Sequence, residues 1–339
     1  MKIDFEHRQS AHCESGVTSN LLSKNTQNKI TEPLAFGIGQ GLFFVYIPFI
    51  KINNGPAFAF RTMPGLIFQR TCKALDIPVV RKKFNSKEQA VNFLNSQLNA
   101  GNPVGCQVGV YYLPYFPKEY RFHFNAHNII VFGKENDNYL ISDPIMETVT
   151  TMTSYELERV RFAKGALAPK GQIYYPENNK IITDDQIKKA IKKGIKKNAF
   201  NMLSIPGKIA GVKGIKYTGN KIKKWRDKLG LEKAGLYLAQ LVRMQEEIGT
   251  GGGGFRYMYG AFLQQAYHYL PKNDELLEIS KKITSAGDLW RNAAVQAAGI
   301  YKGRLGSQAD FDMMGDFLFE ISEIEKKAFT DLQKIKWHE

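Results

Sequence analysis

Apolar residues near the start of the chain first recur at the spacing of a helix, and farther along they form a continuous run that is typical of a buried strand. Val17, Leu21 and Leu22 share one face of a helix that begins after a short polar stretch. Residues 33–41 are punctuated by glycines and predict a tight loop. The aromatic and β-branched run 42–47 that follows predicts a buried strand.

Farther along, helical patterns give way to strand patterns. Helices are expected over 64–75, 86–101 and 154–164, and the second of them opens with a capping box. Strands are expected over 104–112, 127–133, 139–144 and 172–175. The second and third strands are separated by a short polar turn, which predicts an antiparallel hairpin. Helices followed by strands indicate an α+β domain.

The remainder of the chain predicts helices alone. They are expected over 184–200, 229–248, 255–270, 275–298 and 310–337, with polar or glycine-rich breaks between them. A polar stretch at 176–179 marks the change of pattern. We therefore expect an α+β domain over 1–178 followed by an all-helical domain over 179–339.

Composition restricts the class of protein. The 339 residues are 43% hydrophobic and 12% aromatic, which is enough for packed cores. Three cysteines do not make a disulfide framework, and Cys72 and Cys106 lie in helix and strand contexts that predict core positions. Residues 1–6 lack the apolar core of a signal peptide, and the apolar run 41–50 is too short to span a bilayer. These features predict a cytoplasmic protein.

Most of the net charge of +15 lies in one segment. The range Lys188–Arg226 holds twelve lysines, one arginine and no acidic residue. Ile187, Ile191 and Ile195 recur at four-residue spacing among the lysines, which predicts a basic amphipathic helix. This helix could be a solvated surface, could bind an acidic protein partner, or could make peripheral contact with an anionic membrane, and the sequence leaves all three roles open. No nucleic acid is expected, because interleaved aromatics and a known binding module are lacking.

Cys13 is the candidate nucleophile. It lies directly before the first helix, where the positive end of the helix dipole favours a thiolate. A cysteine nucleophile needs a base, usually oriented by a third group. His127 opens one strand of the predicted hairpin and Asp143 ends the other, so both side chains can reach the same end of it. His123, in a more aromatic context, is the rival base.

Four stretches together resemble a known family. They are His12-Cys13-Glu14-Ser15, the loop 36–41, His127 with Asp143-Pro144, and the segment 251–259. They resemble the butirosin biosynthesis protein H family, within the papain-like cysteine enzymes that include the bacteriocin-leader peptidases. The resemblance implies a papain-like fold and an acyltransferase. The founding member of the family moves an aminoacyl group from an acyl carrier protein thioester to an amine of an aminoglycoside.

The resemblance implies roles for particular residues. Cys13 is expected as the nucleophile, His127 as the base and Asp143 as the group that orients the base. Papain-like enzymes carry an oxyanion-binding glutamine shortly before the cysteine. Gln9 is the candidate, although its spacing is shorter than usual, and the backbone amide of Cys13 is a further donor.

Substrate contacts are expected from two places in the chain. His12 and Glu14 flank the nucleophile. Arg256 and Tyr259 follow the glycine-rich stretch 249–254. This stretch is either a flexible linker or a loop whose backbone amides hold an anion such as a phosphopantetheine phosphate. An aromatic segment before the predicted base either excludes water from the site or packs in a core; it comprises Tyr111, Tyr112, Tyr115, Phe116, Tyr120 and Phe122.

The expected function is acyl transfer without a cofactor or a metal. An acyl or aminoacyl group would pass from an acidic acyl carrier protein, docked at Lys188–Arg226, through a Cys13 acyl-enzyme to an amine acceptor. Two alternatives are open. One is a cysteine peptidase or amidase with the same triad, and the other is a non-catalytic protein that binds a carrier protein or a membrane surface.

Overall fold

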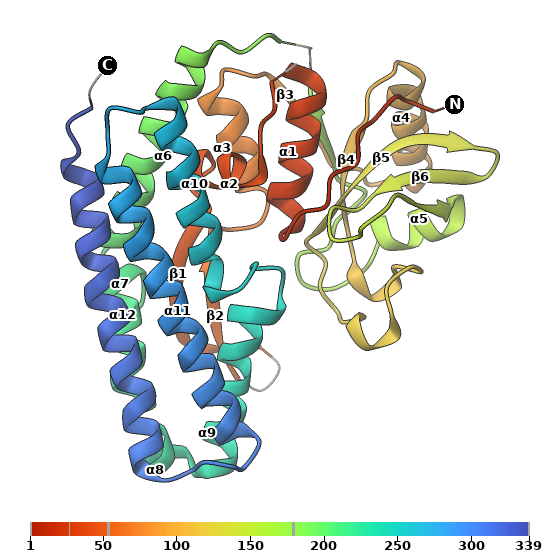
Figure 1. The fold of residues 1–339 in the computed structure, drawn as a ribbon. Helices are drawn as coiled ribbons and strands as arrows, with labels where there is room; N and C mark the ends of the chain where they lie inside the picture. Colours follow the sequence, from red (N-terminus) through yellow and green to blue (C-terminus); the bar gives the residue numbers. More distant parts are fainter. Residues whose placement is uncertain (1, 27, 53–54, 178–179, 338–339) are drawn as a thin grey trace. The chain divides into compact units, whose positions relative to one another are not determined.

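The computed structural model describes the chain except for residues 1, 27, 53–54, 178–179 and 338–339 (Figure 1). The described residues form two compact units. Unit 1 comprises residues 1–35 and 64–186, and unit 2 comprises residues 36–63 and 187–339.

Unit 1 is built on a six-stranded antiparallel sheet in the order β3-β8-β4-β5-β6-β7 (Figure 1). Its strands are β3 (Val79–Lys82), β4 (Val104–Val108), β5 (His127–Glu135), β6 (Asn138–Ser142), β7 (Thr150–Thr153) and β8 (Ile173–Pro176). The predicted hairpin is β5 and β6, in which Ile130 pairs with Ser142. Strands β3 and β7 are additions that the sequence pattern did not indicate. The α+β class is confirmed.

The helices of unit 1 lie close to their predicted ranges. They are α1 (Cys13–Thr26), α3 (Leu66–Ala74), α4 (Lys87–Asn99) and α5 (Ser154–Arg161), while α2 (Glu32–Ile38) spans the change from unit 1 to unit 2. The predicted cap of α4 is present, because the side chain of Ser86 accepts a hydrogen bond from the amide of Gln89. Helix α2 occupies most of the range predicted as a loop.

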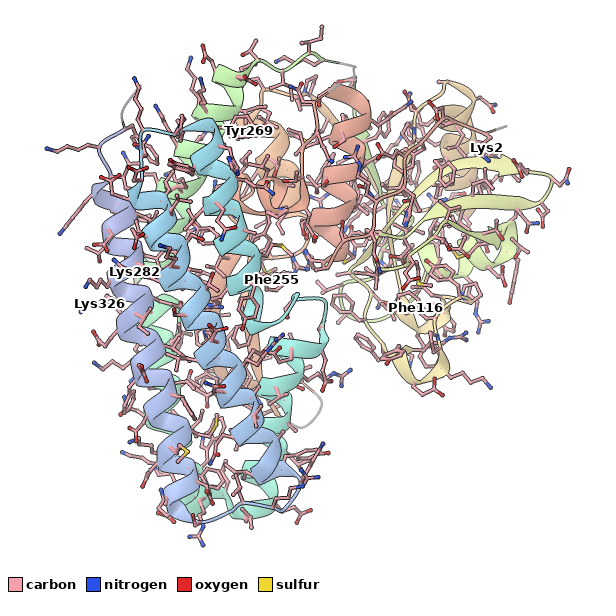
Figure 2. The ribbon with its side chains drawn as sticks, viewed as in Figure 1. Lys2, Phe116, Phe255, Tyr269, Lys282 and Lys326 are labelled. Atoms are coloured by element: carbon pink, nitrogen blue, oxygen red, sulfur yellow. The ribbon has the colours of Figure 1, made fainter. Side chains whose placement is uncertain are left out.

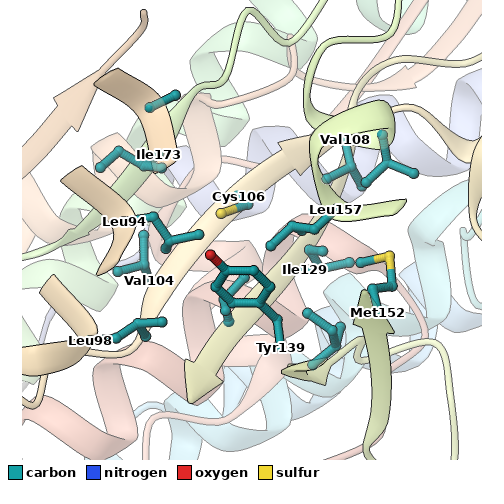
Figure 3. Packing of buried hydrophobic residues seen from close by; sticks show 14 of the residues in the cluster. Leu94, Leu98, Val104, Cys106, Val108, Ile129, Tyr139, Met152, Leu157 and Ile173 are labelled. Atoms are coloured by element: carbon teal, nitrogen blue, oxygen red, sulfur yellow. The ribbon is translucent and has the colours of Figure 1, made fainter. Parts of the chain in front are cut away.

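Alternation along β4 and β5 divides the side chains of the sheet between two faces. Cys106 and Ile129 pair directly and turn to the core beneath α4 and α5, beside Leu94 (Figure 3). On the other face Tyr174 of β8 packs against Phe68 of α3, with ring centroids 4.7 Å apart. Helix α1 also packs against the sheet, mainly against β5. This arrangement brings the first turn of α1 to the end of the sheet where β5 begins.

The core prediction for the two other cysteines is confirmed. Cys72 and Cys106 are fully buried, and burial raises the pKa of both thiols. A raised pKa keeps a thiol protonated, so both side chains behave as small apolar groups.

Unit 2 joins a β-hairpin to a set of helices. The hairpin is β1 (Leu42–Ile52) with β2 (Gly55–Arg61). The helices are α6 (Asp184–Ser204), α7 (Gly211–Ile222), α8 (Trp225–Leu229), α9 (Leu231–Val242), α10 (Arg256–Tyr269), α11 (Glu275–Tyr301) and α12 (Gln308–Lys334). Phe44 and Phe60 of the hairpin pack on Trp290 of α11, with ring centroids 5.7 and 5.1 Å apart.

The two units differ from the expected division of the chain. Residues 36–63 belong with the helices because the aromatic side chains of the hairpin are buried there and not against the six-stranded sheet. The expected boundary at 178/179 lies outside the described residues. Within the part of the chain that is described, no helix is both long and apolar enough to cross a membrane.

Candidate active site

The turn that leads into α1 is held by a buried carboxylate. Glu32 accepts hydrogen bonds from the amides of Ala11 at 2.9 Å and His12 at 2.8 Å, and from the hydroxyl of Ser15 at 3.0 Å. Burial raises the pKa of Glu32, and the three hydrogen bonds oppose that shift. Cys13, the first residue of α1, is thereby fixed in place and is 7% exposed.

A glycine allows α1 to approach the end of the hairpin. The amide of Ser10 donates to the carbonyl of Pro144 at 2.7 Å. A Cβ atom on Gly16 would lie 2.6 Å from the Cβ of Ser10 and 2.7 Å from the Cβ of Pro144. Only glycine fits this contact without displacing its neighbours. The contact sets the distance between the helix that carries Cys13 and the turn that carries Asp143.

His127 and Asp143 meet at this end of the hairpin. The Nε2 atom of His127 lies 2.7 Å from Oδ2 of Asp143, and both side chains are buried. Cys13 also lies close enough to His127 to raise the pKa of the imidazole. Because Asp143 occupies Nε2, Nδ1 is the ring nitrogen left for the sulfur. The structure therefore brings the three predicted residues together in one chain of contacts.

The electrostatics favour a protonated histidine beside the sulfur. Burial lowers the pKa of His127, but the charges of Asp143 and Cys13 and their hydrogen bonds raise it more. The net shift is upward from the ordinary value of 6.5. An imidazolium that persists above neutral pH stabilises a thiolate next to it.

Asp143 is held by two further donors. The hydroxyl of Tyr115 donates to Oδ2 at 3.0 Å, and the amide of Ile145 donates to Oδ1 at 3.0 Å. The ring of Phe116, labelled in Figure 2, meets the ring of His127 edge to face at 5.6 Å. Two members of the aromatic segment therefore support the histidine–aspartate pair directly, a role that their sequence context did not reveal.

Asn128 is a further polar residue at the sulfur, and sequence reasoning missed it. Its Nδ2 atom lies 3.8 Å from Sγ of Cys13. Its Oδ1 atom accepts a hydrogen bond from the hydroxyl of Tyr174 at 2.7 Å. One signal in the sequence could have identified it: Asn128 stands between His127 and the apolar run 129–132 of a buried strand. An amide buried there has no solvent and needs a polar partner.

The other predicted residues of unit 1 have varied positions. His12 is buried with Nδ1 2.9 Å from the hydroxyl of Ser15. Glu14 is also buried and accepts a hydrogen bond from the amide of Ile67, in the first turn of α3, at 2.8 Å. Gln9 has an exposed side chain. His123, the rival base, is exposed and stacks on Tyr111 at 4.2 Å.

Arg256 and Tyr259 lie in unit 2 and are fully buried. The guanidinium of Arg256 forms a two-pronged ion pair with Glu325, with nitrogen–oxygen distances of 2.8 and 2.9 Å. The amides of Gly252 and Gly253 donate to Thr250 and Glu246 at 3.0 Å each; these four residues belong to or precede the glycine-rich stretch. In this structure the arginine and these amides serve the fold, so we do not include them in the site.

Within unit 1, the arrangement supplies the parts of nucleophilic catalysis. A sulfur at a helix start has an imidazole beside it, and a carboxylate fixes the imidazole tautomer. Such a site can form and release an acyl-enzyme.

Comparisons with known proteins bear on this site. Residues 12–144 match the family model for butirosin biosynthesis protein H, N-terminal, and residues 155–332 match the model for a domain of unknown function, DUF4872. A solved structure described as a C39-like peptidase from Bacillus anthracis matches 53% of this chain and 100% of its own, at 15% sequence identity and a TM-score of 0.36. Comparison with curated proteins gave no match.

Proposed function

Because this chain belongs to the DUF4872 family over residues 155–332, and its residues 12–144 match the N-terminal domain of butirosin biosynthesis protein H, we propose that it is a cysteine-dependent acyltransferase. We infer that unit 1 is a papain-like cysteine-enzyme domain, which is supported by its α+β fold and by the match of residues 12–144. The proposed reaction moves an acyl or aminoacyl group from a carrier-protein thioester to an amine. The observation that carries the proposal is the buried contact of Cys13 with the His127–Asp143 pair.

The first half-reaction forms the acyl-enzyme. Cys13 gives its proton to His127, and the resulting thiolate attacks the thioester carbonyl, so a carbon–sulfur bond forms while the carbonyl electrons move to oxygen. The tetrahedral intermediate collapses and expels the thiolate of the carrier. His127 returns its proton to that leaving sulfur.

The second half-reaction releases the product. The amine attacks the acyl-enzyme, and neutral His127 accepts the amine proton. Collapse of the second intermediate forms the amide bond and releases the thiolate of Cys13. The imidazolium–thiolate pair is then ready for the next donor. A buried site favours the amine over water as the acceptor.

Intact-protein mass spectrometry tests the proposed function. Incubation with acyl carrier thioesters is expected to add the mass of the acyl group to the wild-type protein and to leave Cys13→Ala unmodified. Cys72→Ala is the matched control, because Cys72 is buried and its thiol stays protonated. An adduct that is lost when an amine is added supports transfer. Peptide cleavage without any adduct would favour the hydrolase instead.

The donor's carrier protein is proposed to dock on exposed lysines of α6. Lys189, Lys193 and Lys196 are exposed and recur at helical spacing, and we call them the basic face. Acyl carrier proteins are acidic, so charge complementarity favours them as the occupant. By contrast, Lys216 of α7 is paired with Glu323 at 3.2 Å, and Lys223, directly after α7, is paired with Asp316 at 2.5 Å.

Charge reversal tests the basic face. Changing all three of its lysines to glutamate is expected to raise KM for a carrier-protein thioester about tenfold, because electrostatic steering is lost. KM for a pantetheine thioester, which has no carrier protein, should stay constant. The control reverses three exposed lysines elsewhere in unit 2, Lys281, Lys326 and Lys327. Unchanged KM together with lost binding to anionic vesicles would indicate a membrane contact instead.

A further inference from the structure

The amide of Asn128 is aimed at the reacting sulfur. Its Nδ2 atom lies 3.8 Å from Sγ of Cys13 and donates to the carbonyl of Ala126 at 3.0 Å. An amide nitrogen carries two hydrogens, so it can serve both acceptors at once. Because the Ala126 carbonyl can only accept, the nitrogen of the amide and not its oxygen must occupy this side.

Tyr174 holds the other end of the same amide. Its hydroxyl donates to Oδ1 of Asn128 at 2.7 Å. The ring of Tyr174 packs between Phe68 and Gly105. A Cβ atom on Gly105 would lie only 2.5 Å from this ring, so the glycine leaves just enough room for it. Burial raises the pKa of Tyr174 well above its usual value, and the nearby charges of Glu14 and Cys13 add to the shift. The hydroxyl therefore remains a donor.

We propose that Asn128 supplies the side-chain donor that stabilises the oxyanion formed when Cys13 attacks its substrate, with Tyr174 as its positioning residue. The proposal rests on the proposed acyl transfer, since only attack on a carbonyl generates this oxyanion. The oxyanion lies two bonds from the sulfur, so a donor already at the sulfur can reach it.

The position of Asn128 suits this role better than that of Gln9. Asn128 is 4% exposed and its two amide ends are both engaged, so the donor is oriented before the substrate arrives. The side chain of Gln9 is exposed to solvent. Because Cys13 begins α1, its backbone amide lies in the first turn of the helix, and it is the proposed second donor.

Two reagents separate oxyanion stabilisation from thiolate stabilisation. Acylation by p-nitrophenyl acetate passes through an oxyanion, whereas alkylation by iodoacetamide displaces iodide at a saturated carbon and does not. Asn128→Ala is expected to lower the acylation burst rate about 10²- to 10³-fold. Its alkylation rate should fall by far less than its acylation rate, because alkylation loses only the contact of the amide with the sulfur. A matching loss in alkylation, or an unchanged burst, would overturn the proposal.

A second tyrosine–asparagine pair provides the matched control. The hydroxyl of Tyr139 donates to Oδ1 of Asn95 at 2.8 Å, beside the core under α4 and away from Cys13. Asn95→Ala and Tyr139→Phe should leave the acylation burst unchanged, whereas Tyr174→Phe should lower it by a smaller factor than Asn128→Ala. If Asn128→Ala does not fold, Tyr174→Phe carries the test alone, because it removes only one oxygen. Equal losses in both pairs would mean a structural role.

The outcomes also distinguish this inference from the proposed function. A wild-type protein that is acylated by p-nitrophenyl acetate but is inert to carrier thioesters would overturn acyl transfer and leave the assignment of Asn128 intact. Full acylation of Asn128→Ala would overturn that assignment alone. A wild-type protein that forms no acyl-enzyme even with the activated ester would overturn both.

Discussion

Asp143→Asn is expected to slow acyl-enzyme formation at neutral pH by about 10³- to 10⁴-fold while the protein stays folded. The carboxylate accepts from Nε2 of His127 at 2.7 Å, which leaves Nδ1 free to take the proton of Cys13. An asparagine can present its NH2 group to Nε2, which moves the ring proton to Nδ1 and blocks that transfer. Single-turnover acylation with a thioester measures the loss.

The same substitution is expected to change the pH profile in a defined direction. Burial lowers the pKa of His127, and Asp143 is the main group that raises it. Without the carboxylate the pKa falls, so the imidazolium is lost at lower pH. The alkaline limb of the acylation profile should therefore move toward lower pH. An alkaline limb that stays in place would contradict the assigned role.

Tyr115→Phe is the graded comparison for Asp143→Asn. It removes one donor to Oδ2 but keeps the carboxylate charge. The expected loss in acylation is about tenfold, which corresponds to one hydrogen bond to a charged group. The alkaline limb should stay close to its wild-type position. Circular dichroism of both variants checks that the fold is kept, and equal losses in the two would indicate general disruption of the site.

Local sequence patterns predict part of the site. Cys13 was found because a helix start is visible in the spacing of Val17 and Leu21. His127 and Asp143 were brought together by the register of one hairpin, which joins residues that are close in the chain. Short-range geometry of this kind follows from periodicity and turn length.

The residues that support the site could not be predicted from local sequence patterns, because their contacts depend on the pairing order of the sheet. Asn128 and Tyr174 come from different strands, and Tyr174 reaches β5 only through β4, across a pairing order that no single segment encodes. The hairpin 42–61 likewise looked like part of the first domain by its position in the chain. Its membership in unit 2 depends on burial of Phe44 and Phe60 against Trp290, which lies far along the sequence.

Arg256 shows the same limit most clearly. Its place after a glycine run indicated an anion site, but its partner Glu325 is separated from it by 69 residues. Three consecutive residues before it, Gly253, Gly254 and Phe255, have positive φ angles of 57°, 55° and 70°. The carbonyl of Gly254 accepts a hydrogen bond from Arg256 at 2.7 Å. The arginine therefore anchors a left-handed stretch of backbone, with Phe255 at the start of α10 (Figure 2).

Glu325→Gln is expected to lower the free energy of unfolding by about 3–5 kcal/mol, because it leaves a buried guanidinium without its counter-charge. Glu325 accepts from Arg256 and from the indole nitrogen of Trp290 at 3.1 Å, and both members of the ion pair are fully buried. Urea titration of the full chain measures the change in midpoint.

A partly exposed ion pair on the same helix provides the control for Glu325→Gln. Asp331 of α12 pairs with Lys282 of α11 at 2.7 Å, and both side chains are about one-third exposed. Asp331→Asn removes the same charge and is expected to cost less than about 1 kcal/mol, because water screens the pair. Equal losses from the two substitutions would contradict the structural role of Glu325. If Glu325→Gln left the free energy of unfolding unchanged, the charge of Arg256 would not depend on Glu325. Arg256 would then again be a candidate ligand for an anion.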